Sequence, residues 1–282
     1  MTPLLQARFS VDYANKPGVL RNVELELGEG EILGLVGESG SGKSTIALAL
    51  LGLLDHKGGV VTGKILFDGR DLAELPPRAM RRIRGREIAL VLQSPVASLN
   101  PALRIGTQIA EAWRAHNSEA KLWKKRALEL FDLVSLPSED GFLDRYPRQL
   151  SVGQAQRVLI AMAILHRPRL LIADESTSAL DAITQAEILA LFRRLNRELN
   201  MAMLFISHDL LSVASLCQRI AIRQNGRIIE SGSTQQMFRD PRTEDTRALL
   251  QAVMQNSIAA AELVGEVEVN SAGQGPAPQL FR

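Results

Sequence analysis

The sequence predicts an α/β protein with a mostly parallel β-sheet, and three observations support this fold class. Apolar runs typical of buried strands occur at residues 32–36, 88–92 and 202–206. A helical pattern at residues 183–199 lies between an apolar strand at 170–173 and the strand at 202–206. Strands of a parallel sheet are covered on both faces, so they have continuous apolar runs and alternate with helices. The chain has 282 residues, 46% of them apolar, which is enough for one large core with a subdomain.

The N-terminal part is predicted to form short strands joined by turns. Residues 8–13 alternate between polar and apolar side chains, as a half-exposed strand does. Residues 15–18 and 28–31 have the composition of turns, and residues 65–69 indicate a strand followed by a turn. Residues 78–86 indicate a basic helix. Its arginines have no interleaved aromatic residues, so they favour a solvated helix face over a nucleic-acid surface.

The pattern changes after the strand at 88–92, where helical periodicity becomes dominant. The clearest helical segments are residues 105–115 and 120–134. We therefore expect a helical subdomain at about residues 94–168, inserted in a domain that spans residues 1–263. Residues 264–282 are polar and rich in Gly, Pro, Ala and Gln, and we expect them to be disordered.

Composition and charge exclude several classes of protein. The net charge is only +2, from 33 basic and 31 acidic side chains, so no general polyanion-binding surface is expected. A single cysteine, Cys217, excludes an internal disulfide and fits a reducing compartment. Residues 1–8 lack the apolar core of a signal peptide. The longest apolar stretch, residues 46–54, is too short to cross a bilayer, which takes roughly 20 residues. We expect that this chain does not cross a membrane by itself.

A glycine-rich segment at residues 37–44 carries the most specific chemical signal. It has the form G-x-x-x-x-G-K-S, and the apolar strand before it and apolar helix after it disfavour a chance match in a glycine-rich turn. Its glycines expose backbone N–H groups to phosphate oxygens, and the start of the helix adds a positive dipole end. In such a loop, Lys43 contacts the β- and γ-phosphates and Ser44 binds Mg²⁺. The predicted nucleotide-binding residues are Gly37, Glu38, Ser39, Gly40, Ser41, Gly42, Lys43, Ser44 and Thr45.

Two acids, Asp174 and Glu175, follow the predicted strand at 170–173. The alternative is that the two acids only cap the strand before a turn and have no part in catalysis. Beside a phosphate loop, the strand end is expected to deliver Asp174 to the magnesium shell. Glu175 is then placed to polarise the attacking water as a general base.

Three further side chains are candidates because of their positions. Gln93 follows the strand at 88–92, where its amide can contact metal-bound and attacking water; the alternative is an ordinary polar residue after a strand. His208 follows the strand at 202–206, and since neighbouring parallel strands end at the same edge, it is placed to contact the γ-phosphate rather than to be structural. The ring of Tyr13 is suited to stacking on adenine, or else packs in the core from an edge strand.

Together these motifs resemble those of the ATPase subunits of ABC transporters, over about residues 5–255. Residues 37–44 match the family's Walker A loop, and residues 170–175 match Walker B with its catalytic glutamate. Residues 150–154, Leu-Ser-Val-Gly-Gln, nearly match the LSGGQ signature. The remaining matches are residues 178–181 for the D-loop, Gln93 for the Q-loop, His208 for the switch histidine and Tyr13 for the adenine-stacking A-loop.

The resemblance implies a P-loop NTPase core with a mostly parallel sheet, an N-terminal antiparallel β subdomain and an inserted α-helical subdomain. It implies ATP and Mg²⁺ as ligands and ATP hydrolysis as the activity. The implied catalytic residues are Glu175, His208, Gln93 and Lys43. The implied metal shell is Ser44, Gln93 and Asp174. The residues implied to contact ATP bound by an opposite subunit are Ser151, Gly153, Gln154 and Asp181.

Finer features resemble one subgroup, the oligopeptide, dipeptide and nickel importers. These features are residues 37–45, residues 93–101 and the ending at 238–250. The chain departs from the family where Val152 replaces the first glycine of the signature, which puts the partner's ATP site in doubt because a β-branched residue restricts the backbone. Ser176 replaces the usual proline after the catalytic glutamate. The cysteine-rich C-terminal segment of many oligopeptide and dipeptide subunits is absent, which favours the nickel or metallophore type.

The predicted function is therefore ATP hydrolysis coupled to the uptake of peptides, nickel or a metal chelate. The resemblance implies a second, different ATPase subunit, two permease subunits and an extracytoplasmic binding protein, with no nucleic acid. It also implies a peripheral location on the cytoplasmic face of the inner membrane. Two alternatives stay open. One is the ATPase of an ABC exporter, and the other is a soluble ABC ATPase, although such proteins usually have tandem ATPase domains or long coiled-coil insertions.

Overall fold

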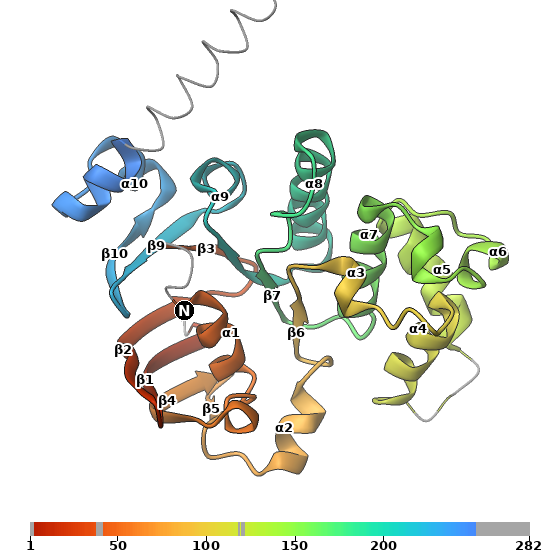
Figure 1. Ribbon diagram of the computed structural model, residues 1–282, viewed down its shortest axis with the longest axis horizontal. Coiled ribbons are helices and arrows are strands. Elements are labelled where there is room, and N and C mark those ends of the chain that lie inside the picture. The colour runs from red at the N-terminus through yellow and green to blue at the C-terminus, as the bar shows by residue number, and fades with distance from the viewer. Residues whose placement is uncertain (1–2, 38–41, 118, 120–121, 252–282) are drawn as a thin grey trace, which may run out of the picture. The chain divides into compact units, whose positions relative to one another are not determined.

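A six-stranded sheet is the centre of the computed structural model, within the described residues 3–37, 42–117, 119 and 122–251 (Figure 1). Its strand order is β10-β9-β3-β8-β7-β6, in which β3 pairs in parallel with β8 and β9, and β7 pairs in parallel with β6 and β8. The mostly parallel sheet is thus confirmed, with β10 as an antiparallel edge strand. The strands are β3 (Ile32–Gly37), β6 (Ile88–Val91), β7 (Leu170–Asp174), β8 (Ala202–Ser207), β9 (Arg219–Gln224) and β10 (Arg227–Ser233).

A smaller antiparallel sheet has the order β2-β1-β4-β5. Its strands are β1 (Leu5–Tyr13), β2 (Lys16–Leu27), β4 (Gly59–Phe67) and β5 (Arg70–Asp71). The turn expected at residues 15–18 is wrong in position, because Tyr13 already pairs with Lys16 and the turn is Ala14–Asn15. Residues 16–18 belong to a bulged part of β2 instead. Gly18 has φ +66 there, and its N–H donates to the Asp12 carboxylate at 2.6 Å.

Helices cover both faces of the six-stranded sheet (Figure 1). α1 (Lys43–Leu50) lies on the face next to the antiparallel sheet, and the apolar side chains between the two sheets form one core cluster. α8 (Ala182–Leu199) and α9 (Leu210–Leu216) lie on the other face. The close approach of α9 explains Gly34 in β3, because a Cβ there would come within 2.3 Å of Val213 Cγ1.

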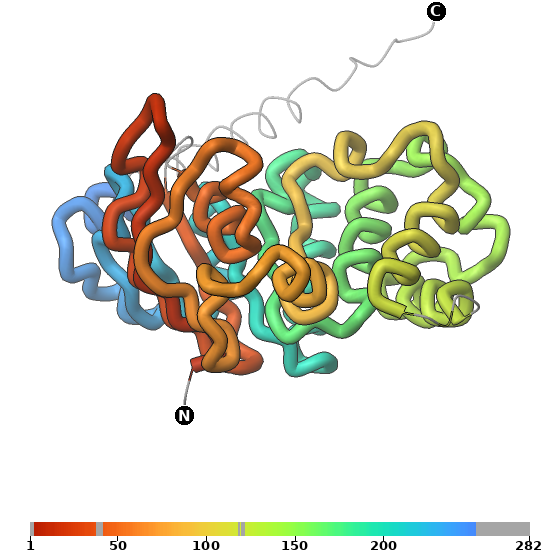
Figure 2. Tube along the Cα trace, turned by 90° about the horizontal axis from the view of Figure 1, so that it is seen from below, coloured from red at the N-terminus to blue at the C-terminus, as the bar shows by residue number. Residues whose placement is uncertain are grey.

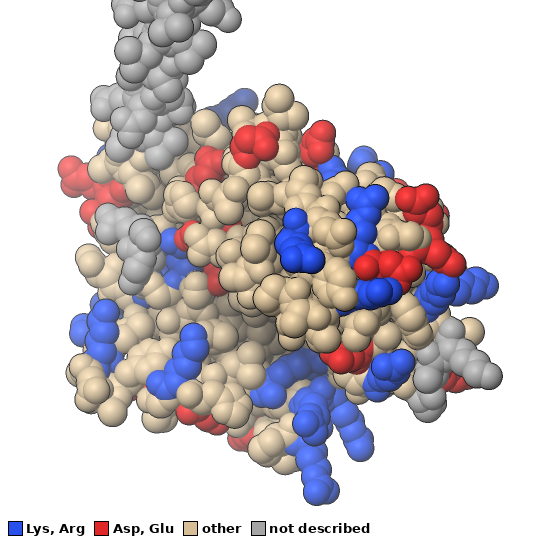
Figure 3. Space-filling model, turned by 45° about the vertical axis from the view of Figure 1, so that its right-hand side comes forward, with Lys and Arg blue, Asp and Glu red and all other residues tan. Residues whose placement is uncertain are grey.

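The basic helix expected at residues 78–86 is shorter than predicted. α2 (Pro77–Ile83) ends because Arg84 is extended and Gly85 has φ +77. The Arg84 guanidinium instead donates hydrogen bonds to the carbonyls of Leu51 and Gly52 at 2.6 and 2.7 Å. Figure 3 shows Lys and Arg side chains gathered over α2 at the lower edge of the view. A short 3-10 helix, Asp55–Lys57, precedes β4.

A group of helices follows β6 in the chain, as the periodicity predicts. The yellow-to-green tube of Figure 2 shows these helices side by side, apart from the red and orange strands. The helices expected at 105–115 and 120–134 are observed as α4 and α5, although residues 120–121 lie outside the described part. The helices are α3 (Pro95–Ser98), α4 (Ile105–Arg114), α5 (Trp123–Leu133), α6 (Asp140–Leu143) and α7 (Val152–Ala163), with a 3-10 turn at Pro147–Gln149.

Residues from 235 onward form a separate compact unit, of which residues 235–251 are described. α10 (Thr234–Arg239) opens it, and the Thr243 and Thr246 hydroxyls are hydrogen-bonded to each other at 2.8 Å. The expected disordered segment 264–282 lies outside the described residues, and the domain bounds 1–263 and 94–168 stay predictions. No helix in the described part of the chain is long and apolar enough to cross a membrane.

Candidate active site

Several predicted site residues lie at one edge of the six-stranded sheet, where β3, β7 and β8 end. The last pairs of the parallel ladders are Asp174 with Ile206 and Val36 with Ser207. The segments that follow these strands therefore start at nearly the same level along the strand direction. Parallel strands place their following loops together in this way, which makes their carboxyl edge a ligand-binding crevice.

The phosphate-loop motif joins β3 to α1 at this edge. Gly42 precedes the helix with φ +91, a conformation that suits glycine. The Lys43 side chain is 3% exposed, and its Nζ donates a hydrogen bond to the Gly37 carbonyl at 2.7 Å. The Thr45 N–H donates to the Gly42 carbonyl at 3.1 Å. The predicted loop residues Glu38, Ser39, Gly40 and Ser41 lie outside the described residues.

The Glu175 carboxylate lies between a cation and an imidazole. Its Oε1 is 3.3 Å from Lys43 Nζ, and its Oε2 is 3.5 Å from His208 Nδ1. The Glu175 backbone has φ +47, which is uncommon for a residue with a side chain, and its N–H donates to the Ile206 carbonyl at 2.9 Å. The sheet edge thus holds this residue in a strained conformation, of the kind that clusters at active sites.

Asp174 is the buried acid of the site, with 6% of the residue exposed. Burial raises the pKa of its carboxyl group, and the neighbouring Glu175 acts in the same direction, whereas a hydrogen bond from Ser44 and the charge of Lys43 act against them. Its Oδ1 has no hydrogen-bond partner in the described structure. A buried carboxylate oxygen without a partner, near the Ser44 hydroxyl, suits Mg²⁺, because this ion is held by one or two protein oxygens together with phosphates.

Gln93 reaches the site through an intermediate residue. Its Nε2 donates a hydrogen bond to Ser178 Oγ at 3.2 Å, and Ser178 Oγ donates to the Glu175 carbonyl at 2.9 Å. The exposed Gln93 side chain is thus linked to the backbone of the proposed base, and its place in the metal shell stays a prediction. The bridging position of Ser178 was not predicted, because hydrogen bonds between distant loops leave no local sequence pattern.

Tyr13, at the end of β1, is half-buried and packs against the core cluster. A Cβ at Gly59 would come within 3.0 Å of its ring, so this glycine makes room for the ring. The core-packing alternative therefore describes part of the ring's environment, and adenine stacking stays a prediction.

The signature residues lie at the N-terminus of α7, within the helical group (Figure 1). Ser151 caps this helix, with its Oγ accepting from the Gln154 N–H at 3.1 Å and the Gln154 Oε1 accepting from the Ser151 N–H at 3.1 Å. Val152 takes a helical conformation and is 46% exposed, so the β-branched residue causes no local strain. A Cβ at Gly153 would come within 2.9 Å of Thr184 Cγ2.

Asp181 caps the neighbouring helix α8. Its carboxylate accepts from the Thr184 N–H at 2.9 Å and from the Thr184 hydroxyl at 2.8 Å, and these bonds lower the pKa of the Asp181 carboxyl group. Ser151, Gly153, Gln154 and Asp181 thus form a second group at two helix N-termini, distinct from the residues gathered around Glu175.

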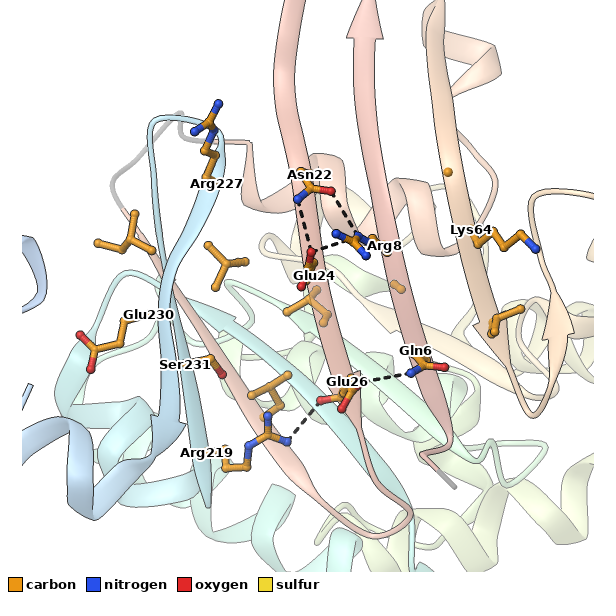
Figure 4. A pocket seen from close by; sticks show the side chains of 17 residues that line it. Gln6, Arg8, Asn22, Glu24, Glu26, Lys64, Arg219, Arg227, Glu230 and Ser231 are labelled. Atoms are coloured by element: carbon orange, nitrogen blue, oxygen red, sulfur yellow. Dashed lines mark hydrogen bonds and ion pairs between the residues drawn. The ribbon is translucent and has the colours of Figure 1, made fainter. Parts of the chain in front are cut away.

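A cleft lies between β10 and the antiparallel sheet (Figure 4). This cleft has a volume of about 1090 Å³ and is lined mainly by β1, β2, β4 and β10. Several of its side chains are paired with each other, as the dashed lines in Figure 4 show. Arg8 Nε lies 3.0 Å from Glu24 Oε1, and Gln6 Nε2 donates to Glu26 Oε1 at 3.0 Å. Arg219 Nη1 donates to Oε1 of Glu31, a residue outside the lining, at 2.8 Å.

Known proteins share both the sequence and the fold of this chain. The family described as ABC transporter matches residues 20–178. The dipeptide transport ATP-binding protein DppD of Haemophilus influenzae is 43% identical over 86% of this chain and 75% of its own length. The oligopeptide transport ATP-binding protein OppD of Bacillus subtilis is 40% identical over 95% of this chain and 74% of its own length.

Solved structures give the same result for the fold. The ATP-binding cassette MJ0796, in a dimeric post-hydrolysis state with ADP and Pi, superposes with a TM-score of 0.69 at 27% identity, over 82% of this chain and 98% of that one. The cbiO1 protein of Clostridium perfringens, part of the transporter complex cbiONQ, has a TM-score of 0.74 at 24% identity, over 85% of this chain and 92% of that one.

Proposed function

The chain belongs to the ABC transporter family, and on that basis we propose that it is the ATP-hydrolysing subunit of an importer for peptides, nickel or a metal chelate. The observation that carries the ATPase assignment is the position of the Glu175 carboxylate, 3.3 Å from Lys43 Nζ and 3.5 Å from His208 Nδ1. A carboxylate fixed between a cation and an imidazole beside a phosphate-loop motif fits the base of a phosphoryl-transfer site.

The residues divide the reaction between them. The phosphate-loop glycines and Lys43 bind the β- and γ-phosphates, and Glu175 accepts the proton of the water that attacks the γ-phosphorus. His208 orients this water and the Glu175 carboxylate. Ser44 and Asp174 would hold Mg²⁺ bound together with ATP, and this ion would supply positive charge to the phosphate oxygens.

The ion pair between Lys43 and Glu175 gives the site a resting state. While Lys43 holds the Glu175 carboxylate at 3.3 Å, that carboxylate is engaged in the ion pair. The phosphates of ATP compete for Lys43, so ATP binding frees Glu175 for the attacking water. Hydrolysis is thereby tied to a bound triphosphate.

The second group of residues is the surface offered to another ATPase subunit. Ser151, Gly153 and Gln154 at the start of α7 would contact ATP held by the partner, and Asp181 would lie beside it. Val152 stands where the family signature has a glycine, and its side chain is exposed, so ATP bound by the partner would meet a larger side chain here. A second ATPase of different sequence would confine this change to one of the two ATP sites.

The transported solute is proposed from the relatives. Those compared are named for dipeptide, oligopeptide and glutathione import, which supports a peptide solute and leaves nickel or a metal chelate as the further possibility. The assembly would contain two permeases and an extracytoplasmic binding protein, with this chain on the cytoplasmic face of the inner membrane. Gln93, linked to Glu175 through Ser178, would connect the ATP site with the helices that face the permeases.

A pull-down tests the importer assignment. The tagged chain is purified from its native membranes in mild detergent, and the proteins bound to it are identified by mass spectrometry. Two permeases, a second ATPase and a binding protein are the expected partners. Recovery of soluble proteins alone, with the chain absent from the membrane fraction, would refute the transport function and leave the ATPase function standing.

A further inference from the structure

A buried arginine lies beside both ends of the phosphate-loop motif. Arg223 in β9 is the register partner of Gly37, the last residue of β3. A Cβ at Gly42, the residue before α1, would come within 3.2 Å of Arg223 Nη2. The guanidinium group therefore lies next to the point where the loop enters the helix.

Most of this guanidinium group has no partner. Arg223 is 1% exposed, and its Nη2 donates to the Val19 carbonyl at 3.0 Å. In the described structure, its Nε and Nη1 atoms make no hydrogen bond. Burial lowers the pKa of Arg223 to about 10, so the group still carries its charge at neutral pH. A buried charge without a partner is costly, and such groups are normally paired with an opposite charge.

The surroundings of Arg223 favour an anionic ligand. The N-terminus of α1, which begins directly after Gly42, is the positive end of the helix dipole and an unfavourable neighbour for a buried cation. A phosphate chain bound at the loop would offset both positive charges.

The strand order tells which end of a nucleotide Arg223 would meet. β9 lies on one side of β3, and β8 and β7, which are followed directly by His208 and Glu175, lie on the other. The Arg223 guanidinium also donates to the carbonyl of Val19 in β2, the strand that pairs with β1 and Tyr13. Arg223 is thus on the side of the proposed adenine contact and away from the residues that act on the γ-phosphate.

We propose that Arg223 is a nucleotide-binding residue that holds the phosphate chain at its nucleoside end, where ATP and ADP are alike. This inference rests on the proposed ATPase function. Arg223 is then a binding residue without a part in bond cleavage, so its removal weakens ATP and ADP binding equally.

Equilibrium binding of ATP and of ADP to the purified full chain tests this inference. Arg223→Gln removes the charge and keeps a donor for the Val19 carbonyl. About 10-fold weaker binding of both nucleotides is expected, because hydrogen bonds to charged groups are among the stronger ones. Arg227→Gln is the matched control, since Arg227 is exposed on β10, and its affinities should equal those of the wild type.

Thermal unfolding without nucleotide separates binding from a structural role. The Arg223→Gln chain should unfold at the wild-type temperature or above, because an unpaired buried charge is gone, and should gain less stability from added ATP. Wild-type affinities in a folded variant would refute the inference, and so would a lower unfolding temperature with unchanged nucleotide stabilisation.

Arg223→Lys, which keeps the charge, is the second variant and is used if the glutamine variant does not fold. It should bind both nucleotides more weakly than wild type by the same factor, and equal affinity would count against Arg223. If the wild type itself binds neither nucleotide, the proposed function fails instead.

Discussion

Two regions of this protein, the cleft of Figure 4 and the carboxyl edge of the parallel sheet, differ in how their polar atoms are paired. In the cleft, charged side chains such as Arg8 and Glu24 pair with each other. At the carboxyl edge of the parallel sheet, Asp174 Oδ1, Ser176 Oγ and two nitrogens of Arg223 are buried without partners, which are four of the seven such atoms in the described residues. Buried polar atoms without partners are costly in a folded chain, and a ligand can satisfy them. This incomplete pairing is the reason for proposing that the chemistry takes place at the sheet edge and not in the cleft.

The largest expected effect is on ATP turnover, from a change at the carboxyl edge of the parallel sheet. Glu175→Gln removes the proposed base and keeps the size of the side chain. ATP hydrolysis by the assembled complex should fall by at least about 100-fold, while ATP stays bound. Phosphate release and nucleotide retention are measured on the same preparation, and turnover at the wild-type rate would remove Glu175 from its role.

Asp174→Asn should have opposite effects on stability and activity. Burial opposes the charged form of Asp174, as the raised pKa of its carboxyl shows, so a neutral isostere should raise the free energy of unfolding without nucleotide by about 1–3 kcal/mol. Hydrolysis should be lost, since a ligand of the proposed metal site is gone. Asp140→Asn, which removes one partner of an exposed ion pair with Lys124, is the control and should change stability by less than about 1 kcal/mol. A destabilised Asp174→Asn chain would contradict the account of the edge.

A second, smaller hollow extends the comparison to pH. His166 Nε2 lies 3.1 Å from the Ala112 carbonyl, to which it donates, so Nδ1 at 3.1 Å from Asn117 Nδ2 is an acceptor and the ring is neutral. Burial lowers the pKa of His166, and the charges of Arg86 and Arg126 and the ring of His116 act in the same direction. The exposed Arg167 also lines this hollow.

A lowered pKa means that the folded protein binds the proton less tightly than the unfolded chain does. Stability should therefore be full above the ordinary histidine value of 6.5 and fall as the pH drops from there towards the folded-state pKa. Denaturant unfolding at pH 7.5 and 5.5 should show a smaller pH effect for His166→Gln than for the wild type. Equal pH effects would show that His166 is not responsible.

The smallest effect is expected in the cleft. Arg8 and Glu24 are paired at 3.0 Å with side chains 72% and 57% exposed, and exposed pairs of this kind contribute little. Arg8→Met should change the free energy of unfolding by less than about 1 kcal/mol and leave hydrolysis unchanged. A large loss of ATPase activity would mean that the cleft takes part in the function after all.

The sequence predicted the elements whose signal is local. Continuous apolar runs located β3, β6, β7 and β8, and the order of strands and helices indicated the parallel sheet. No element was predicted at β9 or β10, because Arg219, Arg223 and Gln224 interrupt the apolar pattern of β9. The turn at residues 15–18 was misplaced because a bulge, set by the Asp12 hydrogen bond to Gly18, depends on pairing between strands.

The residues of the candidate site were likewise predictable only where the signal lies in the motifs and their order. The ends of parallel strands bring Lys43, Glu175 and His208 together, and this follows from the order of the motifs alone. The bridge from Gln93 through Ser178 and the burial of Arg223 beside Gly42 arise from contacts between distant segments. Such contacts appear only once the chain is folded.

The central claim is that the incompletely paired edge of the sheet, and not the cleft of Figure 4, binds the nucleotide. A structure of the full chain carrying Glu175→Gln, determined with Mg²⁺ and ATP, tests it most directly. Density for the triphosphate beside Lys43, Asp174 and Arg223, with the cleft of Figure 4 unchanged, is the predicted result. Nucleotide density in that cleft, with the edge unchanged from its present geometry, would contradict the claim.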